Sequence, residues 1–192
     1  MTNICVFCAS SLGNHPIYKE TAHQLGKVFA EKNIRLIYGG GNVGLMGVIA
    51  DSVLENGGEV YGVIPDFLDK KEVAHKNLTK LFIVGSMHER KTKMFEFSDA
   101  IIALPGGFGT LEELTEVLTW AQLNLHNKPI AVLNVNGYYN HLIALFDHMV
   151  SEGLLKEENR RKVLISESVS GLLDLISENL KTETDRFEKE KT

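Results

Sequence analysis

Short apolar runs alternate with amphipathic segments along most of the chain, and this alternation restricts the fold more than any other feature. The run from Ala100 to Leu104 is apolar at every position, as expected for a strand buried on both faces, and a proline follows it. The next segment carries apolar residues at helical spacing, from Leu111 to Ala121. Strands and helices in alternation predict a parallel sheet with helices on both faces, joined by right-handed crossovers. We therefore expect an α/β fold, a Rossmann-like single domain with about seven strands.

The same pattern defines the expected elements and the domain. We expect strands over residues 4–9, 34–38, 59–64, 81–84, 100–104, 129–135 and 163–166, and helices over residues 16–31, 44–56, 86–98, 110–125, 139–152 and 169–180. The connection over residues 66–79 is longer than a usual strand–helix loop, which predicts a lid or binding loop. The domain spans residues 1–180, and residues 181–192 form a densely charged tail that we expect to be disordered.

The composition is ordinary for a globular protein and argues against several functions. With 192 residues and a formal net charge of −5, the chain lacks the positive charge of a broad nucleic-acid surface. No apolar run approaches the roughly 20 residues that a membrane helix needs. The N-terminus lacks the basic and apolar regions of a signal peptide. We expect a cytoplasmic protein that binds neither nucleic acid nor membrane.

Neither the cysteines nor the histidines form a pattern typical of a cofactor or metal site. Cys5 and Cys8 lie three positions apart on an expected strand, so their side chains should point to opposite faces. A redox C-x-x-C normally opens a helix and a zinc site needs two further ligands, so we expect buried packing. The seven histidines are scattered, without an H-x-x-x-H pair or a carboxylate cluster. We expect no metal and no cofactor.

A glycine-rich turn follows the strand expected at residues 100–104 and opens the next helix. From Pro105 to Thr110 it places three glycines within four positions, which frees the backbone to turn tightly and approach a ligand. Thr110 has the residue type of a helix N-cap. Unpaired N–H groups at a helix start favour anions, so we expect a phosphate here. The adjacent carboxylates Glu112 and Glu113 do not fit a simple phosphate loop, because they would repel the anion.

The helix expected at residues 86–98 can supply the cations that such a phosphate needs. Arg90 shares the apolar face of this helix with two methionines, so its charge requires a partner. Either its guanidinium reaches back to solvent, or it meets an anionic ligand together with Lys91. Glu113 also has two interpretations, as the last residue of a T-x-x-E capping box or as a group at a reacting centre.

A second glycine-rich turn, Gly39-Gly40-Gly41-Asn42-Val43-Gly44, follows the strand expected at residues 34–38 and matches G-x-G-x-x-G. With Asp66 about twenty residues further on, it fits the fingerprint of a dinucleotide site, and an NAD(P) enzyme is one interpretation. Simple turn geometry is another. The third interpretation also accounts for the first glycine turn: both turns form walls of one nucleotide site at the carboxyl edge of the sheet.

Three motifs together resemble those of the LOG family, the cytokinin riboside 5′-monophosphate phosphoribohydrolases that are often mislabelled as lysine decarboxylases. Residues 105–113 match the family signature P-G-G-x-G-T-x-x-E. Residues 87–91 (MHERK) resemble its second motif, and residues 38–47 (YGGGNVGLMG) resemble its third. Nothing in the sequence supports lysine decarboxylation, since no lysine has a recognisable pyridoxal-phosphate context.

The resemblance implies a hydrolase that cleaves the N-glycosidic bond of adenosine 5′-monophosphate-type nucleotides to free base and ribose 5-phosphate. The nucleotide would be cytokinin riboside 5′-monophosphate or AMP, and the catalytic pair would be Arg90 and Glu113. By the same resemblance the substrate contacts are Glu72, Arg90, Lys91, Gly106, Gly107, Phe108, Gly109, Thr110, Leu111, Glu112, Glu113 and Thr119. The alternative is a non-catalytic nucleotide-binding or sensing module, which would need the glycine turn but not the acid.

Thr119 suggests an assembly with more than one subunit. It lies about 14 Å along the helix from Thr110, at roughly 1.5 Å per residue, and so far from a phosphate at the helix start. We therefore expect Thr119 to contact the nucleotide of a neighbouring subunit, which predicts a homodimer with composite active sites. Glu112 and Glu113 are about 100° apart on a helix, so at most one should face the reacting centre. We assign that position to Glu113 and a supporting contact to Glu112.

Overall fold

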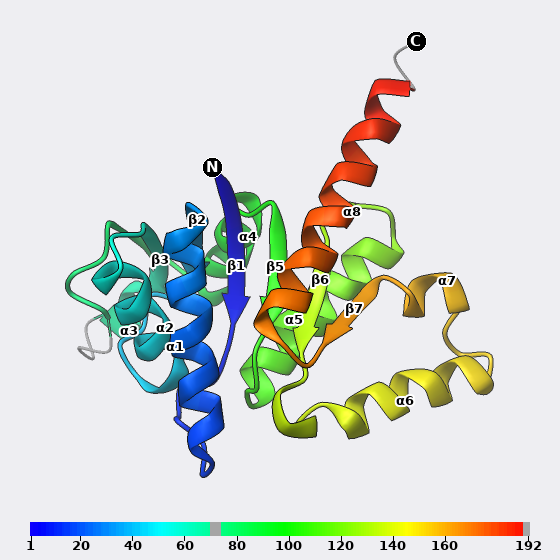
Figure 1. Cartoon of the computed structure of the whole chain (residues 1–192), viewed down its shortest axis with the longest axis horizontal. Helices are drawn as coiled ribbons and strands as arrows, with labels where there is room; N and C mark the ends of the chain where they lie inside the picture. The colour runs from blue at the N-terminus through cyan, green and yellow to red at the C-terminus, as the bar shows by residue number, and fades with distance from the viewer. Residues whose placement is uncertain (70–73, 190–192) are drawn as a thin grey trace.

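The computed structural model describes residues 1–69 and 74–189, with side chains described as far as residue 182, and confirms the parallel α/β fold (Figure 1). Seven parallel strands form one sheet in the order β4-β3-β2-β1-β5-β6-β7. The strands are β1 (Thr2–Phe7), β2 (Ile34–Tyr38), β3 (Val60–Pro65), β4 (Lys80–Val84), β5 (Ala100–Ala103), β6 (Ile130–Leu133) and β7 (Val163–Ser166). The helices are α1 (Pro16–Glu31), α2 (Gly44–Glu55), α3 (Asp66–Asp69), α4 (Met87–Glu96), α5 (Phe108–Gln122), α6 (Asn140–Ser151), α7 (Glu157–Arg160) and α8 (Val169–Lys189), with a 3-10 turn η1 (Val135–Gly137).

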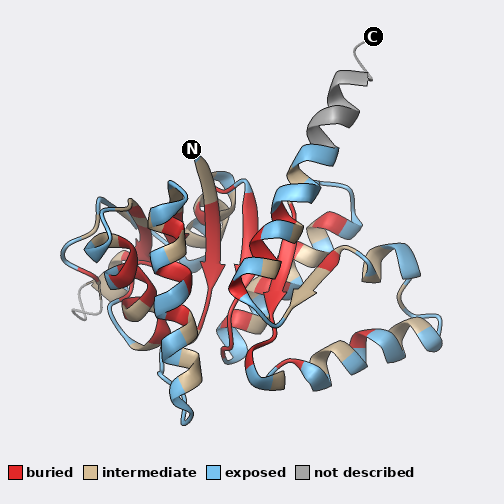
Figure 2. Ribbon diagram, in the orientation of Figure 1, coloured by how far each residue is buried: buried red, intermediate tan, exposed pale blue. Residues whose placement is uncertain are grey.

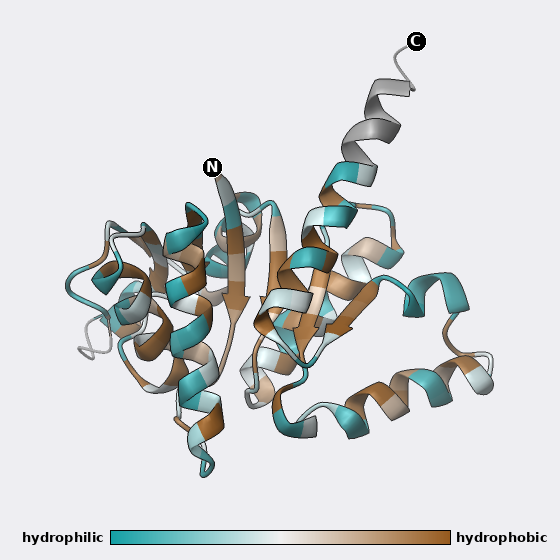
Figure 3. Cartoon of the chain, in the orientation of Figure 1, coloured by the Kyte–Doolittle hydropathy of each residue, from teal (hydrophilic) through white to brown (hydrophobic). Residues whose placement is uncertain are grey.

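Helices cover both faces of the sheet, and each face has its own apolar core. On one face α1, α2 and α8 pack on the strands through residues such as Leu25, Ile49 and Leu172. On the other face α4 and α5 pack through residues such as Met94 and Leu114. Figure 2 shows the central strands buried between the two layers, and Figure 3 shows that these strands are hydrophobic along most of their length. The strands are apolar on both sides because both sides are covered.

Cys5 and Cys8 belong to different cores, as their spacing predicts. Cys5 lies in the core beneath α4 and α5, and Cys8 lies in the core beneath α1 and α2. Both are free, buried thiols, and burial raises the pKa of both well above the ordinary value. They therefore stay protonated at neutral pH and lack the thiolate character of a redox cysteine.

The direction of the chain across the sheet reverses at β1, and this reversal determines where a ligand can bind. The chain moves from β1 outward to β4, then crosses back through α4 to β5 on the other side of β1. The segments that leave β1 and β5 lead to α1 and α5, which cover opposite faces of the sheet. Such a switch point leaves a crevice at the carboxyl edge. The glycine turns after β2 and β5 lie at the same edge.

Most expected elements are confirmed to within a few residues, and the main differences lie at element ends. β1 runs from Thr2 to Phe7 where residues 4–9 were expected, and α8 continues to Lys189 instead of ending at residue 180. The sequence did not predict α3, α7 or η1, because a single helical turn is too short to show the 3.6-residue period. α5 begins at Phe108, two residues before the expected start at Thr110, and this difference bears on the site.

Candidate active site

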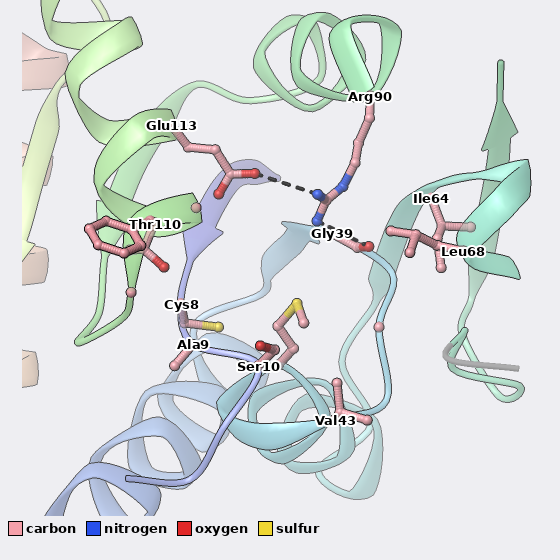
Figure 4. Close-up of a pocket in the computed structure, with 15 residues that line it drawn as sticks. Cys8, Ala9, Ser10, Gly39, Val43, Ile64, Leu68, Arg90, Thr110 and Glu113 are labelled. Carbon is pink, nitrogen blue, oxygen red and sulfur yellow. Dashed lines mark hydrogen bonds and ion pairs between the residues drawn. The ribbon is translucent and has the colours of Figure 1, made fainter. Parts of the chain in front are cut away.

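A cavity of about 430 Å³ opens at the crevice between β1 and β5 (Figure 4). The segments after β1, β2 and β5 and the end of β3 supply most of its walls. The cavity is lined by Cys8, Ala9, Ser10, Gly39, Gly41, Val43, Met46, Ile64, Leu68, Arg90, Gly107, Phe108, Gly109, Thr110 and Glu113. Its volume lies within the roughly 300 to 1,000 Å³ that is typical of small-molecule sites.

The start of α5 presents backbone to this cavity without a capping side chain. Its N-cap is Gly107, which has no side chain. Thr110 lies inside the first turn and is buried, so its predicted role as the N-cap is wrong. Its side chain packs on Gly106, where an added Cβ would fall 2.1 Å from Thr110 Oγ1. The helix start therefore keeps N–H groups available for an anion.

The earlier start of α5 also excludes Glu113 as a helix cap. In a capping box the acid occupies the third helical position, which Thr110 holds here. Glu113 lies almost one turn further along, and its side chain points into the cavity toward Arg90 (Figure 4). The T-x-x-E capping box is therefore wrong, and the interpretation of Glu113 as a group at a ligand site stands.

Arg90 extends from α4 into the cavity wall and does not reach back to solvent. Its Nε donates to the backbone oxygen of Val63 at 3.2 Å, and one terminal nitrogen donates to the backbone oxygen of Gly39 at 3.4 Å. The other terminal nitrogen lies 3.7 Å from Glu113 Oε1, and the two side chains are only 12% and 11% exposed. The partners of this guanidinium are thus two backbone carbonyls, one carboxylate and the thioether of Met87, whose sulfur lies 3.9 Å from a terminal nitrogen.

The environment of Glu113 changes its acidity. Burial raises the pKa of Glu113 from 4.5 to about 7, and the Arg90 guanidinium opposes that rise. At neutral pH both protonation states of the carboxyl are therefore populated, which suits a group that donates, accepts or balances charge during a reaction. A buried acid with a perturbed pKa in a cavity is typical of a functional site.

Lys91, next to Arg90 on α4, forms ion pairs with two carboxylates of α5. Its Nζ bonds to Glu112 Oε1 at 2.5 Å and to Glu116 Oε1 at 3.0 Å. The hydrogen bond to Glu112 raises the pKa of Lys91, so the ammonium stays charged. Lys91 and Glu112 are not among the residues that line the cavity, and their contact with a substrate stays a prediction.

The other predicted contacts are distributed over several places. Phe108 lies at the cavity rim with 94% of its surface exposed, whereas Leu111 packs against the core beneath α5. Thr119 donates its hydroxyl to the backbone oxygen of Thr115 and lines a separate cavity of about 170 Å³ beside α6. Glu72 lies outside the described residues.

The glycine turn after β2 forms a wall of the same cavity, as the third interpretation of that motif predicts. Gly40 and Gly44 have positive φ angles of 74° and 60°. Gly39 lies so close to the guanidinium that an added Cβ would fall 1.8 Å from a terminal nitrogen of Arg90. The turn therefore needs its glycines for backbone geometry and for the close approach of Arg90.

Sequence reasoning missed part of the apolar cavity wall. Cys8 and Ile64 line the cavity without belonging to a predicted motif, whereas Met46 lies within residues 38–47 of the third family motif and Leu68 within the predicted lid or binding loop of residues 66–79. Cys8 could have been found from its place at the end of the first strand if the strand order had been known. The strand order is set by tertiary packing and has no local signal.

Two solved structures share the fold at low sequence identity. The molybdenum cofactor (Moco) carrier protein of Chlamydomonas reinhardtii has a TM-score of 0.69 at 20% identity, over 94% of this chain and 98% of that chain. The molybdenum cofactor binding protein of Rippkaea orientalis has a TM-score of 0.67 at 22% identity, over 92% of this chain and 94% of that chain. Over the described residues, no helix is long and apolar enough to cross a membrane. In that same part of the chain, no three His, Cys, Asp or Glu side chains are grouped to hold a metal ion.

Fold and cavity together define a doubly wound α/β protein with a nearly buried arginine–glutamate pair at the carboxyl edge of its sheet. The model of a family described as possible lysine decarboxylase matches residues 46–176. The chain is 48% identical to the cytokinin riboside 5′-monophosphate phosphoribohydrolase LOG1 of Arabidopsis thaliana, over 88% of this chain and 80% of the relative. It is also 48% identical to the probable cytokinin riboside 5′-monophosphate phosphoribohydrolase LOGL1 of Oryza sativa subsp. japonica, over 88% of this chain and 76% of the relative. The chain therefore belongs to the LOG family.

Proposed function

We propose that the protein hydrolyses the N-glycosidic bond of adenosine 5′-monophosphate-type nucleotides, with Arg90 and Glu113 as the catalytic pair. The observation that carries this proposal is the nearly buried Arg90–Glu113 pair in a cavity beside an uncapped helix start. The names of the relatives support it, since both are cytokinin riboside 5′-monophosphate phosphoribohydrolases or probable ones. The products are the free base and ribose 5-phosphate.

In this reaction the bond between ribose C1′ and the base nitrogen breaks, and the oxygen of water forms the new bond to C1′. The base keeps the electron pair of the broken bond and takes up a proton, while the attacking water loses one. The sugar passes through an oxocarbenium-like state, which a carboxylate beside C1′ stabilises. Ionised Glu113 supplies that negative charge or accepts the proton of the attacking water.

The remaining groups at the cavity bind the nucleotide. The N–H groups at the start of α5 bind the 5′-phosphate, aided by the helix dipole. Arg90 holds the Glu113 carboxylate in place and adds positive charge for the anionic substrate. The apolar wall that includes Met46 and Ile64 leaves room for a flat base. Of the contacts implied for residues 106–111, those of residues 107–110 are supported by their place in the cavity lining.

A product assay tests the proposal. The protein is incubated with N6-isopentenyl-AMP, AMP and N6-isopentenyladenosine, and base, ribose 5-phosphate, nucleoside and inorganic phosphate are quantified. We expect base and ribose 5-phosphate in equal amounts from the nucleotides. The nucleoside should react at least about 10²-fold more slowly than the nucleotides, because it lacks the phosphate whose binding energy positions the sugar. Nucleoside plus inorganic phosphate, or no product, would overturn the proposal.

We further propose a homodimer in which α5 of one subunit contributes to the site of the other. Thr119 lies on α5 outside the cavity of its own chain and lines a surface hollow together with Phe146 and Met149. Large apolar side chains nearby, including Leu123 and Leu154, are exposed, as is typical of an interface. We expect specific activity to fall when the enzyme is diluted until the dimer dissociates. A monomer with full activity at catalytic dilution would contradict the composite site.

A further inference from the structure

Two consecutive tyrosines bond to the backbone of the glycine turn that follows β5. The Tyr139 hydroxyl donates to the backbone oxygen of Leu104 at 2.6 Å, and the Tyr138 hydroxyl donates to that of Gly106 at 2.7 Å. The carbonyl between these two accepts from the N–H of Ala9 at 3.2 Å. Three successive carbonyls of the turn are therefore held by donors from other parts of the fold.

The segment between β6 and α6 is folded so that it brings both hydroxyls to the turn. Asn136 and Gly137 have positive φ angles of 52° and 67°, a conformation that asparagine and glycine adopt more readily than other residues. The side chain of Asn134 accepts from the N–H of Tyr139 at 2.8 Å. Tyr139 is buried in the core beneath α5, whereas 42% of Tyr138 is exposed. The backbone on both sides of Tyr138 is thus fixed.

The Tyr138 hydroxyl acts on the only peptide group of the turn that lies between two glycines, Gly106 and Gly107. In a trans peptide the carbonyl oxygen and the next N–H point in opposite directions, so the direction of one determines that of the other. Glycines on both sides offer the least resistance to a flip of this peptide. A flip would turn the Gly106 oxygen to the place where the Gly107 N–H points now.

The two sides of this peptide face different hollows. Gly107 lines both the candidate active-site cavity and a second hollow of about 200 Å³, whereas Gly106 and Tyr138 line the second and not the first. The bonded carbonyl is thus directed away from the active-site cavity. Gly107 is the N-cap of α5, so its N–H is one of the four that have no acceptor within the helix. A phosphate dianion is attracted by such an N–H and repelled by a carbonyl oxygen.

We propose that Tyr138 is a positioning residue of the phosphate site, whose hydroxyl holds the Gly106 carbonyl away from the cavity and so directs the Gly107 N–H toward the 5′-phosphate. This inference rests on the proposed function and gives a role to a residue outside the three family motifs. Tyr138 itself does not touch the nucleotide. Its hydroxyl strengthens the binding of the phosphate and leaves the chemistry at Arg90 and Glu113 as it is.

The test compares Tyr138→Phe with Tyr18→Phe in the full-length protein. Tyr18 is the matched control, because its ring packs edge-on against that of Tyr138 with 5.8 Å between the centroids. kcat/KM for base release is measured with N6-isopentenyl-AMP and N6-isopentenyladenosine, which differ only in the 5′-phosphate. We expect Tyr138→Phe to lower the nucleotide value by roughly 3- to 10-fold, as is typical of one lost hydrogen bond, and to leave the nucleoside value within about twofold. Tyr18→Phe should leave both values unchanged.

Substitutions of Gly107 provide a second readout that acts on the N–H itself. Gly107→Pro removes this N–H, whereas Gly107→Ala keeps it. An added Cβ at this position has no atom of the described residues within 4 Å. If Tyr138 acts through the Gly107 N–H, Tyr138→Phe should cost nothing further in the Gly107→Pro background and should keep its full effect in the Gly107→Ala background.

Three results would contradict the role of Tyr138: an unchanged nucleotide rate in Tyr138→Phe, equal losses for nucleotide and nucleoside, or additive losses in the Gly107→Pro background. If the wild-type protein releases no base, the proposed function fails. Calorimetry with ribose 5-phosphate and with ribose then decides the role of Tyr138 separately. The proposal requires that Tyr138→Phe weakens the binding of ribose 5-phosphate and that Tyr18→Phe does not.

Discussion

Glu113→Gln is expected to release base from N6-isopentenyl-AMP about 10²- to 10⁴-fold more slowly than the wild-type protein, the range typical of a lost acid–base group. Glutamine keeps the size of the side chain and can still bond to Arg90, so the cavity should keep its shape. It has no negative charge to stabilise the sugar cation and accepts no proton from water. The measurement is kcat for base release at pH 8, where wild-type Glu113 is mostly ionised.

Two controls make this result specific to Glu113. Glu20→Gln removes the same charge from an exposed position on α1 and should leave base release unchanged. Nucleotide binding by Glu113→Gln, measured by calorimetry, should stay within about threefold of the wild type, because the group acts mainly in the transition state. If Glu113→Gln keeps full turnover, Glu113 is not the reacting group. If it loses binding and turnover together, its role is ground-state binding.

Gly39→Ala is expected to lower base release by about 10²-fold or more, a loss typical of an ångström-scale misplacement of a catalytic group. The new Cβ would fall 1.8 Å from a terminal nitrogen of Arg90, so the guanidinium must move. That movement would break the bond to the Gly39 carbonyl and disturb the pair with Glu113. Because Arg90 lowers the pKa of Glu113, its displacement should also shift the acid limb of the pH profile upward.

Gly85→Ala is the matched control for this prediction, because its added Cβ would meet Glu89 Oε2 at 3.5 Å, an ordinary contact distance. It should keep near-wild-type activity and a similar melting temperature. Gly39→Ala with full activity and an unshifted profile would show that the position of Arg90 does not govern the reaction. A parallel drop in melting temperature and activity for both variants would indicate a general cost of replacing these glycines.

The fold could be predicted from the sequence because its main signals are local. A strand such as β5, buried on both faces, is apolar at every position, and a helix such as α2 ends at Glu55, with Asn56 as its C-cap just before Gly57, whose φ is 78°. The order of the strands has no such signal, so the walls contributed by Cys8 and Ile64 could not be foreseen. The start of α5 was misplaced because Gly107 and Gly109 are poor helix formers, while Thr110 is a good N-cap by residue type.

The site was predicted in part, and the limit is again physical. Spacing alone indicated that Arg90 needs a partner and that only one of Glu112 and Glu113 can face the centre, and both points agree with the structure. Spacing does not show which cation meets which acid across two helices. The pairing of Lys91 with Glu112 depends on the docking of α4 against α5, which only the tertiary structure defines.

The pH dependence of kcat/KM for base release tests the central claim most directly, namely that ionised Glu113 beside Arg90 breaks the glycosidic bond. The substrate phosphate ionises near pH 6 and is fitted separately from its own 31P titration. We predict a further acid limb with an apparent pKa of about 7, which Glu113→Gln removes from its residual activity. A wild-type profile with no ionisation beyond that of the phosphate, or a limb that persists in Glu113→Gln, would contradict the account.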